Sequence, residues 1–378
     1  VSAAAGAEVT QAFLPDDSDR ATATVVSDGQ TVKIEFVKDK NEGFVLQYDD
    51  YYTFDPGFSG ASFVSDNPSV AEVSNKGEIH VLKVSDKAVN ITATAGAQTK
   101  TLTITKTIKA VLAVWMLTGQ SNSAINYFDK NTAIVPKKGT TLYYGWQFNG
   151  TSDSVNYSLP ADLIPMTAAN GTLNVASNEP ALASTLYSKT GEKILMLNGG
   201  ISGTGISYFL PGCGTDTKTY TWAHTNEVYE QAYALWNSKT YLENYETRVR
   251  SYFFLQGCAE VGSEWTVHYN GFAVNKNVNS FKTLGKTYAA GTHTWRTYMS
   301  DILGFDYCFD ILIAWRPVGI VTSTRTAQMK LAEDFDDYFI ATRINQTFSL
   351  EEGTYRYDNL HYSQIGKNYL GQSAAAKA

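Results

Sequence analysis

The sequence predicts a protein of two domains, in which an all-β region precedes an α/β domain with a mostly parallel sheet. Three observations lead to this prediction. The chain has 378 residues, more than one ordinary hydrophobic core accommodates. Residues 21–107 contain short runs rich in Val, Ile and Thr, whereas helix-like and strand-like stretches alternate from about residue 108. Such alternation is typical of a parallel sheet covered by helices.

The first part of the chain divides into two segments. Residues 1–20 are small and polar, which predicts an arm or linker. Residues 21–107 alternate apolar and polar side chains in runs such as 21–26, 32–37 and 89–95, separated by Gly, Asn and Asp. Short, regularly spaced strands of this kind are typical of a β-sandwich.

Residues 108–378 have a different pattern. Ala110–Leu117 is a continuous apolar run, as expected for a strand buried on both faces. Four helix-like stretches then lead into strand-like ones: 179–189 into 193–198, 226–246 into 250–255, 279–303 into 310–315, and 326–336 into 338–343. In such folds ligands bind at the carboxyl ends of the strands, so the site is expected there.

Composition excludes several classes of function. The net charge is −7 and basic residues are not clustered, so nucleic acid is not an expected partner. No apolar run approaches the roughly 20 residues of a membrane-spanning helix. Cys213, Cys258 and Cys308 are odd in number and widely spaced, which fits neither a zinc ribbon nor a disulfide framework. Buried thiols, or one disulfide and a spare thiol, are the expectations that remain.

Ser121 is the candidate nucleophile. It lies in a small, polar turn, residues 118–123, directly after the apolar strand. A serine hydroxyl needs a neighbouring base to become nucleophilic at neutral pH. The G-x-S-x-G elbow is incomplete because Ser123 occupies its last position, and Walker A, G-x-G-x-x-G and H-E-x-x-H patterns are absent.

His361 is the candidate base, since it is the one of five histidines with an acidic residue at a useful spacing. Asp358 precedes it by three residues, so the two can share one turn. A carboxylate placed there would orient the imidazole and stabilise the imidazolium formed during catalysis. A D-x-x-H pattern alone is usually a surface turn. Together with the serine at the strand end, it becomes a hypothesis for the catalytic partners of Ser121.

Two stretches of the first region resemble a known family. Residues 65–77 resemble the S-x-x-P-S-V-A-x-V-S-x-x-G signature of bacterial Ig-like domains of group 2, and residues 91–105 resemble the last two strands of that family. The resemblance implies an Ig-like sandwich over residues 21–107. It also implies an extracellular or cell-surface setting, or a phage virion, in which the module acts as a spacer or adhesive unit.

Four ordered blocks of the second region resemble SGNH hydrolases of the sialate O-acetylesterase and acetyl-xylan esterase branch. Gly119–Asn122 resembles its G-Q-S-N-M block, Gly200–Ile206 its G-G-T-S-I block, Phe254–Gly257 its W-x-Q-G-E block, and Asp358–Gly366 its D-x-x-H block. Residues 178–180 also lie where this branch often has Gly-Pro before its first long helix. The resemblance implies a three-layer α/β/α, flavodoxin-like domain over residues 108–378.

The resemblance also assigns roles to single residues. Ser121 would attack an ester carbonyl, His361 would take and return the proton, and Asp358 would hold His361. The backbone N–H groups of Ser121 and Gly203 and the side-chain amide of Gln256 would form the oxyanion hole. Gln120, Asn122 and Glu260 would support the site, and neither a metal nor another cofactor is required.

The chain departs from the family pattern at three positions. Ser123 replaces the Met of the first block, Ser202 replaces the first Gly of the second, and Cys258 replaces the Glu of Q-G-E. Glu260 lies two residues further on and would have to supply the missing carboxylate. These changes leave the triad intact but bear on its efficiency.

The expected function is that of a serine carbohydrate esterase that removes O-acetyl groups from extracellular glycans through an acyl-enzyme. Its partner would be an O-acetylated polysaccharide, with surface or virion partners for the Ig-like module. The alternative is a non-catalytic, glycan-binding surface or virion protein on a degenerate esterase fold. A lipase or thioesterase of the same superfamily fits the carbohydrate-type blocks less well.

Overall fold

The computed structural model describes residues 8–13, 20–27, 30–37, 44–123, 132–145, 147–149, 156–166, 178–201, 205–210, 220–257, 267–269, 272–274, 281–313, 321–348, 355 and 361–378. The chain forms two compact units, and each is described by itself. The first comprises Val1–Leu46, Thr53–Ile79 and Ser85–Ile108, and the second comprises Gln47–Tyr52, His80–Val84 and Lys109–Ala378.

The N-terminal strands form a sheet of their own. β1 (Glu8–Phe13), β2 (Arg20–Ser27) and β3 (Gln30–Val37) pair antiparallel in that order. The segment 1–20, expected to be an arm, therefore contains a strand. Its sequence from Glu8 to Phe13 is short and does not strictly alternate polar and apolar residues, so the strand signal there is weaker than in the longer runs that follow.

The remaining strands before residue 109 form two further sheets. One has the order β4 (Phe44–Gln47), β10 (Gln98–Ile108), β9 (Val89–Ala95), β6 (Ser62–Ser65), and the other β5 (Tyr51–Thr53), β8 (Glu78–Val81), β7 (Ala71–Val73). On β9 the side chains of Val89, Ile91 and Ala93 are buried and those between them are not, which is the period expected of a strand with one face inward. The expected strands at 21–37 pair with β1 and with each other in the sheet described above.

The C-terminal region contains a seven-stranded, mostly parallel sheet, so the predicted α/β class is confirmed. Its order is β15 (Ile164–Pro165), β12 (Thr141–Gly145), β16 (Lys193–Asn198), β11 (Ala110–Gly119), β17 (Tyr245–Leu255), β20 (Cys308–Ile311), β21 (Tyr338–Thr342). Only β15 runs antiparallel to its neighbour in this sheet. Short hairpins are formed by β13 (Gln147–Asn149) with β14 (Asn156–Ser158) and by β18 (Val267–Tyr269) with β19 (Phe272–Val274).

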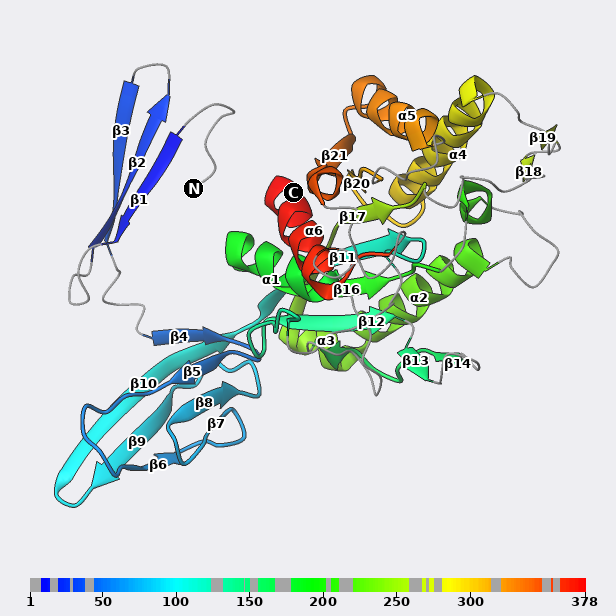
Figure 1. The fold of residues 1–378 in the computed structure, drawn as a ribbon. Coiled ribbons are helices and arrows are strands. Elements are labelled where there is room, and N and C mark those ends of the chain that lie inside the picture. The colour runs from blue at the N-terminus through cyan, green and yellow to red at the C-terminus, as the bar shows by residue number, and fades with distance from the viewer. Residues whose placement is uncertain are drawn as a thin grey trace. The chain divides into compact units, whose positions relative to one another are not determined.

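Helices cover both faces of this sheet (Figure 1). α1 (Glu179–Thr190) and α6 (Gln364–Lys377) pack side by side on one face. α2 (Tyr220–Trp236), α4 (Phe281–Asp301) and α5 (Val321–Asp334) cover the other. α3 (Lys239–Asn244) precedes β17, and the short 3₁₀ turns are η1 (Ile206–Phe209) and η2 (Ile344–Thr347). None of the helices in the described residues is long and apolar enough to cross a membrane.

The central strand, β11, is buried along nearly its whole length, which explains why its sequence is a continuous apolar run. Every residue of β11 except Val111 is buried, because β16 and β17 flank it and helices cover both faces.

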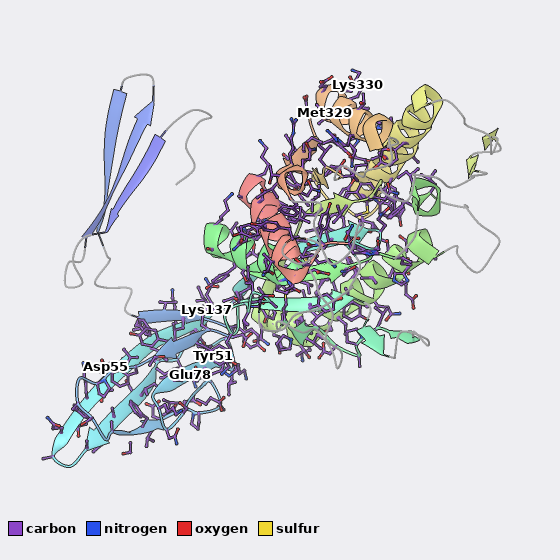
Figure 2. The ribbon with its side chains drawn as sticks, viewed as in Figure 1. Tyr51, Asp55, Glu78, Lys137, Met329 and Lys330 are labelled. Carbon is purple, nitrogen blue, oxygen red and sulfur yellow. The ribbon has the colours of Figure 1, made fainter. Side chains whose placement is uncertain are left out.

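The helix α5, in contrast, has one buried side and one exposed side. Leu331 is buried against the sheet, whereas Lys330, labelled in Figure 2, is exposed and forms an ion pair with Asp334 one turn on.

Two differences from the expected elements have physical causes. The expected helix 226–246 is two helices, since α2 ends at Trp236 and α3 begins at Lys239, with Ser238 at its N-cap. α6 was not expected, because its C-terminal half is a run of alanines without a strong apolar stripe. It packs through its small residues, with Ala374 and Ala375 buried against the sheet.

Candidate active site at the carboxyl end of β11

The turn after β11 lies at the point where the strand order changes direction. The chain leaves β11, builds β12 and β16 on one side, and then continues with β17, β20 and β21 on the other. Open α/β sheets bind ligands at such switch points, outside the carboxyl ends of the strands. Ser121 is the second residue after β11, so it lies at the position where this class of fold binds ligands.

The turn is tight, and a glycine allows it. Gly119 has a φ of 143°, and a Cβ at this position would lie 2.1 Å from the carbonyl oxygen of Leu255. That same carbonyl accepts a hydrogen bond from the N–H of Gln120 at 3.1 Å. The N–H and the hydroxyl of Ser123 both donate to the Gln120 carbonyl, at 2.8 and 2.7 Å. Ser121 itself is only 5% exposed.

Side-chain amides from two other segments hold the turn. The Nδ2 of Asn178 donates to the carbonyl of Asn122 at 2.7 Å. The Nδ2 of Asn198 donates to the carbonyl of Ser123 at 3.1 Å. These bonds satisfy buried carbonyl groups that the tight turn leaves without a partner in regular secondary structure. The backbone of residues 121–123 is therefore positioned from both α1 and β16.

The segment that contains His361 meets the same turn. The N–H of Tyr362 donates to the Oδ1 of Asn122 at 3.2 Å. The hydroxyl of Tyr362 accepts a hydrogen bond from the Nδ2 of Asn345 at 3.1 Å, and that amide also donates to the Leu312 carbonyl at 2.7 Å. The bonded pair, Asn122 and Tyr362, directly follows Ser121 and His361 in sequence. The structure thus brings these two segments together across 240 residues.

Gln256 lies at the end of the neighbouring strand, β17, and is fully buried. Its carbonyl accepts hydrogen bonds from the Nε2 of Gln328 at 3.3 Å and from the hydroxyl of Tyr288 at 3.4 Å. Gly257 follows with a φ of 121°, and a Cβ there would lie 2.9 Å from the Cγ2 of Thr324. The backbone at the end of β17 is therefore fixed by packing against α4 and α5.

A buried carboxyl group lies behind this strand end. Gln328 donates to the Oδ1 of Asp310 at 3.0 Å, and the hydroxyl of Tyr338 donates to its Oδ2. Burial raises the pKa of Asp310 to about 8, although both hydrogen bonds favour the ionised form and oppose the rise. Gln328 thus links Asp310 on β20 to the backbone of Gln256 on β17.

A second buried acid lies under the Ser121 turn. Glu179, the first residue of α1, accepts a hydrogen bond from the Nδ2 of Asn198. Burial raises the pKa of Glu179 to about 7, an increase opposed by this hydrogen bond and by the charge of Lys367. Burial also lowers the pKa of Lys367 to about 8, and the charge of Glu179 opposes that change. Both groups are fully buried, and the charge of each opposes the effect of burial on the pKa of the other.

The remaining predicted site residues lie outside the described residues. These are Asp358, Gly203 and Glu260, together with Cys258 and Ser202, at which the chain departs from the family pattern. Cys308 is a buried free thiol. Within the part of the chain that the structure describes, no group of three or more His, Cys, Asp or Glu side chains is placed to hold a metal ion.

Sequence reasoning missed the residues that hold the site together. Asn198, Gln328 and Asp310 were not singled out, and Asn178 was noted only for its place before a helix. A signal existed for two of them, since Asn198 closes the apolar strand 193–198 and Asp310 interrupts the apolar strand 308–311. A polar residue in such a strand must find a hydrogen-bond partner once it is buried.

The known proteins that this chain resembles are only distantly similar to it. No protein-family model matches the chain, and no curated protein matches it in sequence. Among solved structures, an Arabidopsis thaliana protein is 13% identical with a TM-score of 0.43, covering 70% of this chain and 96% of that one. A carbohydrate acetylesterase from Xanthomonas citri is 13% identical with a TM-score of 0.44, covering 89% and 73%. NanS is 10% identical with a TM-score of 0.40, covering 71% and 97%.

Proposed function

We propose that this chain is a serine carbohydrate esterase that removes O-acetyl groups from extracellular glycans. The proposal includes an SGNH-hydrolase domain over residues 108–378 and an Ig-like sandwich over 21–107 that serves as a spacer on a cell surface or virion. One observation supports it above the others: the hydrogen bond from Tyr362 to Asn122 joins two sequence blocks that both belong to the proposed site.

In the proposed mechanism, the Ser121 hydroxyl attacks the acetyl carbonyl while His361 accepts its proton. The tetrahedral oxyanion would be met by the N–H groups of Ser121 and Gly203 and by the amide of Gln256. Collapse breaks the ester bond, and His361 gives the proton to the departing sugar oxygen. Water, deprotonated by the same imidazole, then attacks the acyl-enzyme. Collapse of this second intermediate breaks the bond to Ser121, His361 returns the proton to the Ser121 oxygen, and acetic acid leaves and ionises to acetate, with Asp358 orienting His361 throughout.

The burial of the Ser121 turn supports this chemistry. A nearly dry turn strengthens hydrogen bonds to a developing oxyanion, and a donor fixed in advance is worth roughly 3 kcal/mol of transition-state stabilisation. The turn is fixed by side chains from α1 and β16 and by the segment after His361. No step in this mechanism draws on a bound cofactor.

The test is hydrolysis of p-nitrophenyl acetate by the wild-type protein, by Ser121→Ala, and by Ser373→Ala as a matched control. Ser373 bonds Thr342 at 2.6 Å between α6 and β21, so its loss removes a hydrogen bond of the same domain without touching the turn. Turnover should fall by a factor of at least about 10³ in Ser121→Ala and stay within about twofold in Ser373→Ala. Mass spectrometry after fluorophosphonate treatment should locate the adduct on Ser121.

The substrate is identified by acetate release from acetylated xylan and from O-acetylated sialic acid in parallel. If the folded wild-type protein releases no acetate from any of these substrates, or if Ser121→Ala is as active as wild type, the esterase proposal is wrong. Binding of the wild-type protein to the same glycans without turnover would then favour the alternative, a non-catalytic glycan-binding surface or virion protein.

A further inference from the structure

Asn198 occupies the last position of β16, and its side chain makes three hydrogen bonds. Its Nδ2 donates to the carbonyl of Ser123 at 3.1 Å and also to the carboxyl of Glu179. Its Oδ1 accepts from the N–H of Gly200 at 2.8 Å, two residues further along the chain. All three bonds are buried or half-buried, and Asn198 itself is only 3% exposed.

These bonds place Asn198 at the junction of two segments that the proposed function uses. The turn at residues 119–123 contains Ser121, and residues 199–201 lead to Gly203. Backbone bonds also join residues 199–201 to the end of β11, from the N–H of Ile201 to the Gly119 carbonyl at 3.0 Å and from the N–H of Gly199 to the Leu117 carbonyl at 3.1 Å. Asn198 adds the side-chain connection.

The neighbouring groups determine the orientation of the Asn198 side-chain amide. Gly145 lies beside it on β12, where a Cβ would approach the Asn198 carbonyl oxygen to 2.9 Å and the Asn198 Cβ to 3.0 Å. The Nδ2 faces two oxygen acceptors, and the Oδ1 faces a backbone donor. A reversed amide would set its oxygen against the Glu179 carboxyl and the Ser123 carbonyl, both of which are buried acceptors.

We propose that Asn198 is a positioning residue that sets the spacing between the Ser121 turn and the segment leading to Gly203. In this role it holds residues 199–201 against the turn and fixes in advance the backbone of residues 121–123, which carries the Ser121 N–H group of the proposed oxyanion hole. The inference rests on the proposed function, because the oxyanion hole belongs to that mechanism. A misplacement of about 1 Å in such a site lowers the rate by a factor of about 100.

The kinetic test uses Asn198→Ser, Asn198→Ala and the control Ser373→Ala. A serine at this position retains an acceptor for the Gly200 N–H but cannot donate to Ser123 and Glu179 together. Rates are expressed per active site titrated with a fluorophosphonate, so that unfolded protein does not count. We expect kcat to fall about 10- to 100-fold in both Asn198 variants, with KM within about twofold, while Ser373→Ala keeps its kcat.

A second measurement does not depend on activity. Hydrogen exchange should become faster at the N–H groups of Ser123 and Ile201 in the Asn198 variants, and should not change in β21. Unchanged kcat per site, or unchanged exchange in both segments, overturns the inference. A wild-type protein that hydrolyses nothing disproves the proposed esterase and the catalytic part of this inference with it; faster exchange would then support only the connection between the two segments.

Discussion

The turns of the first unit and the turn after β11 differ in how far away in sequence their hydrogen-bond partners lie. In the first unit, Ser74 Oγ accepts from the Glu78 N–H at 3.1 Å, and Asp55 Oδ1 accepts from the Gly57 N–H at 2.8 Å. After β11, Ser123 also bonds locally to the Gln120 carbonyl, but three further partners of the turn come from residues 56, 75 and 240 positions away. Turns closed by neighbouring residues form wherever the local sequence permits them. A turn held by residues far away in the sequence exists only in the completed fold.

The difference has a physical consequence. A turn closed by its own neighbours costs little to alter, because water can replace the lost hydrogen bond at the surface. A buried turn held by distant groups leaves donors or acceptors without partners when one member is removed, at about 1–3 kcal/mol each. The buried turn after β11 is therefore more sensitive to substitution than the local turns of the first unit.

The largest expected effect is that of Gly119→Ala compared with Gly96→Ala. Both glycines have positive φ, 143° and 58°, but a Cβ at Gly119 lies 2.1 Å from the Leu255 carbonyl oxygen and one at Gly96 meets nothing within 4 Å. Gly119→Ala should lower the free energy of unfolding by about 3 kcal/mol or more, and Gly96→Ala by about 1 kcal/mol. Urea unfolding measures both, and equal losses would contradict the comparison.

The next effect concerns pH and Asp310. Its pKa is about 8 in the folded chain against 3.8 as its ordinary value, so the folded state binds the proton more tightly. Stability should therefore fall as pH rises from about 4 through 8. Asp310→Asn carries no charge and should lose less stability over that range than the wild type, by about 2 kcal/mol or more.

Urea unfolding at pH 5 and pH 8 checks this expectation. Glu179, whose pKa is raised to about 7, remains in both proteins and contributes a loss in the same direction, so only the difference between them reports on Asp310. Identical pH dependence in the two proteins would show that Asp310 does not titrate in this range.

The smallest effects come from a pair of serine substitutions. Ser123→Ala removes a buried hydrogen bond to the Gln120 carbonyl at 2.7 Å, and Ser74→Ala removes exposed bonds that close a local turn. The first should cost about 1–2 kcal/mol and reduce turnover several-fold, and the second should cost less than about 1 kcal/mol without changing turnover. Thermal unfolding and esterase rates measure both, and a larger loss in Ser74→Ala would reverse the comparison.

The sequence by itself determined the parts of this protein that depend on local pattern. The apolar run 110–117 marked the central strand, and the helix expected at 179–189 is α1, Glu179–Thr190. Sequence also put Ser121 directly after that strand and singled out His361 among five histidines. Hydrophobic periodicity and turn chemistry are written in neighbouring residues, so they can be read without knowledge of the fold.

The tertiary structure alone decided which distant polar groups meet. Nothing in the sequence pairs Asn198 with Ser123, Asn178 with Asn122, or Gln328 with Asp310 and the Gln256 carbonyl. These partners depend on the order of strands in the sheet and on which helix covers which face. A buried polar group must be satisfied by whatever the completed fold places beside it, and that neighbour is set by topology and packing.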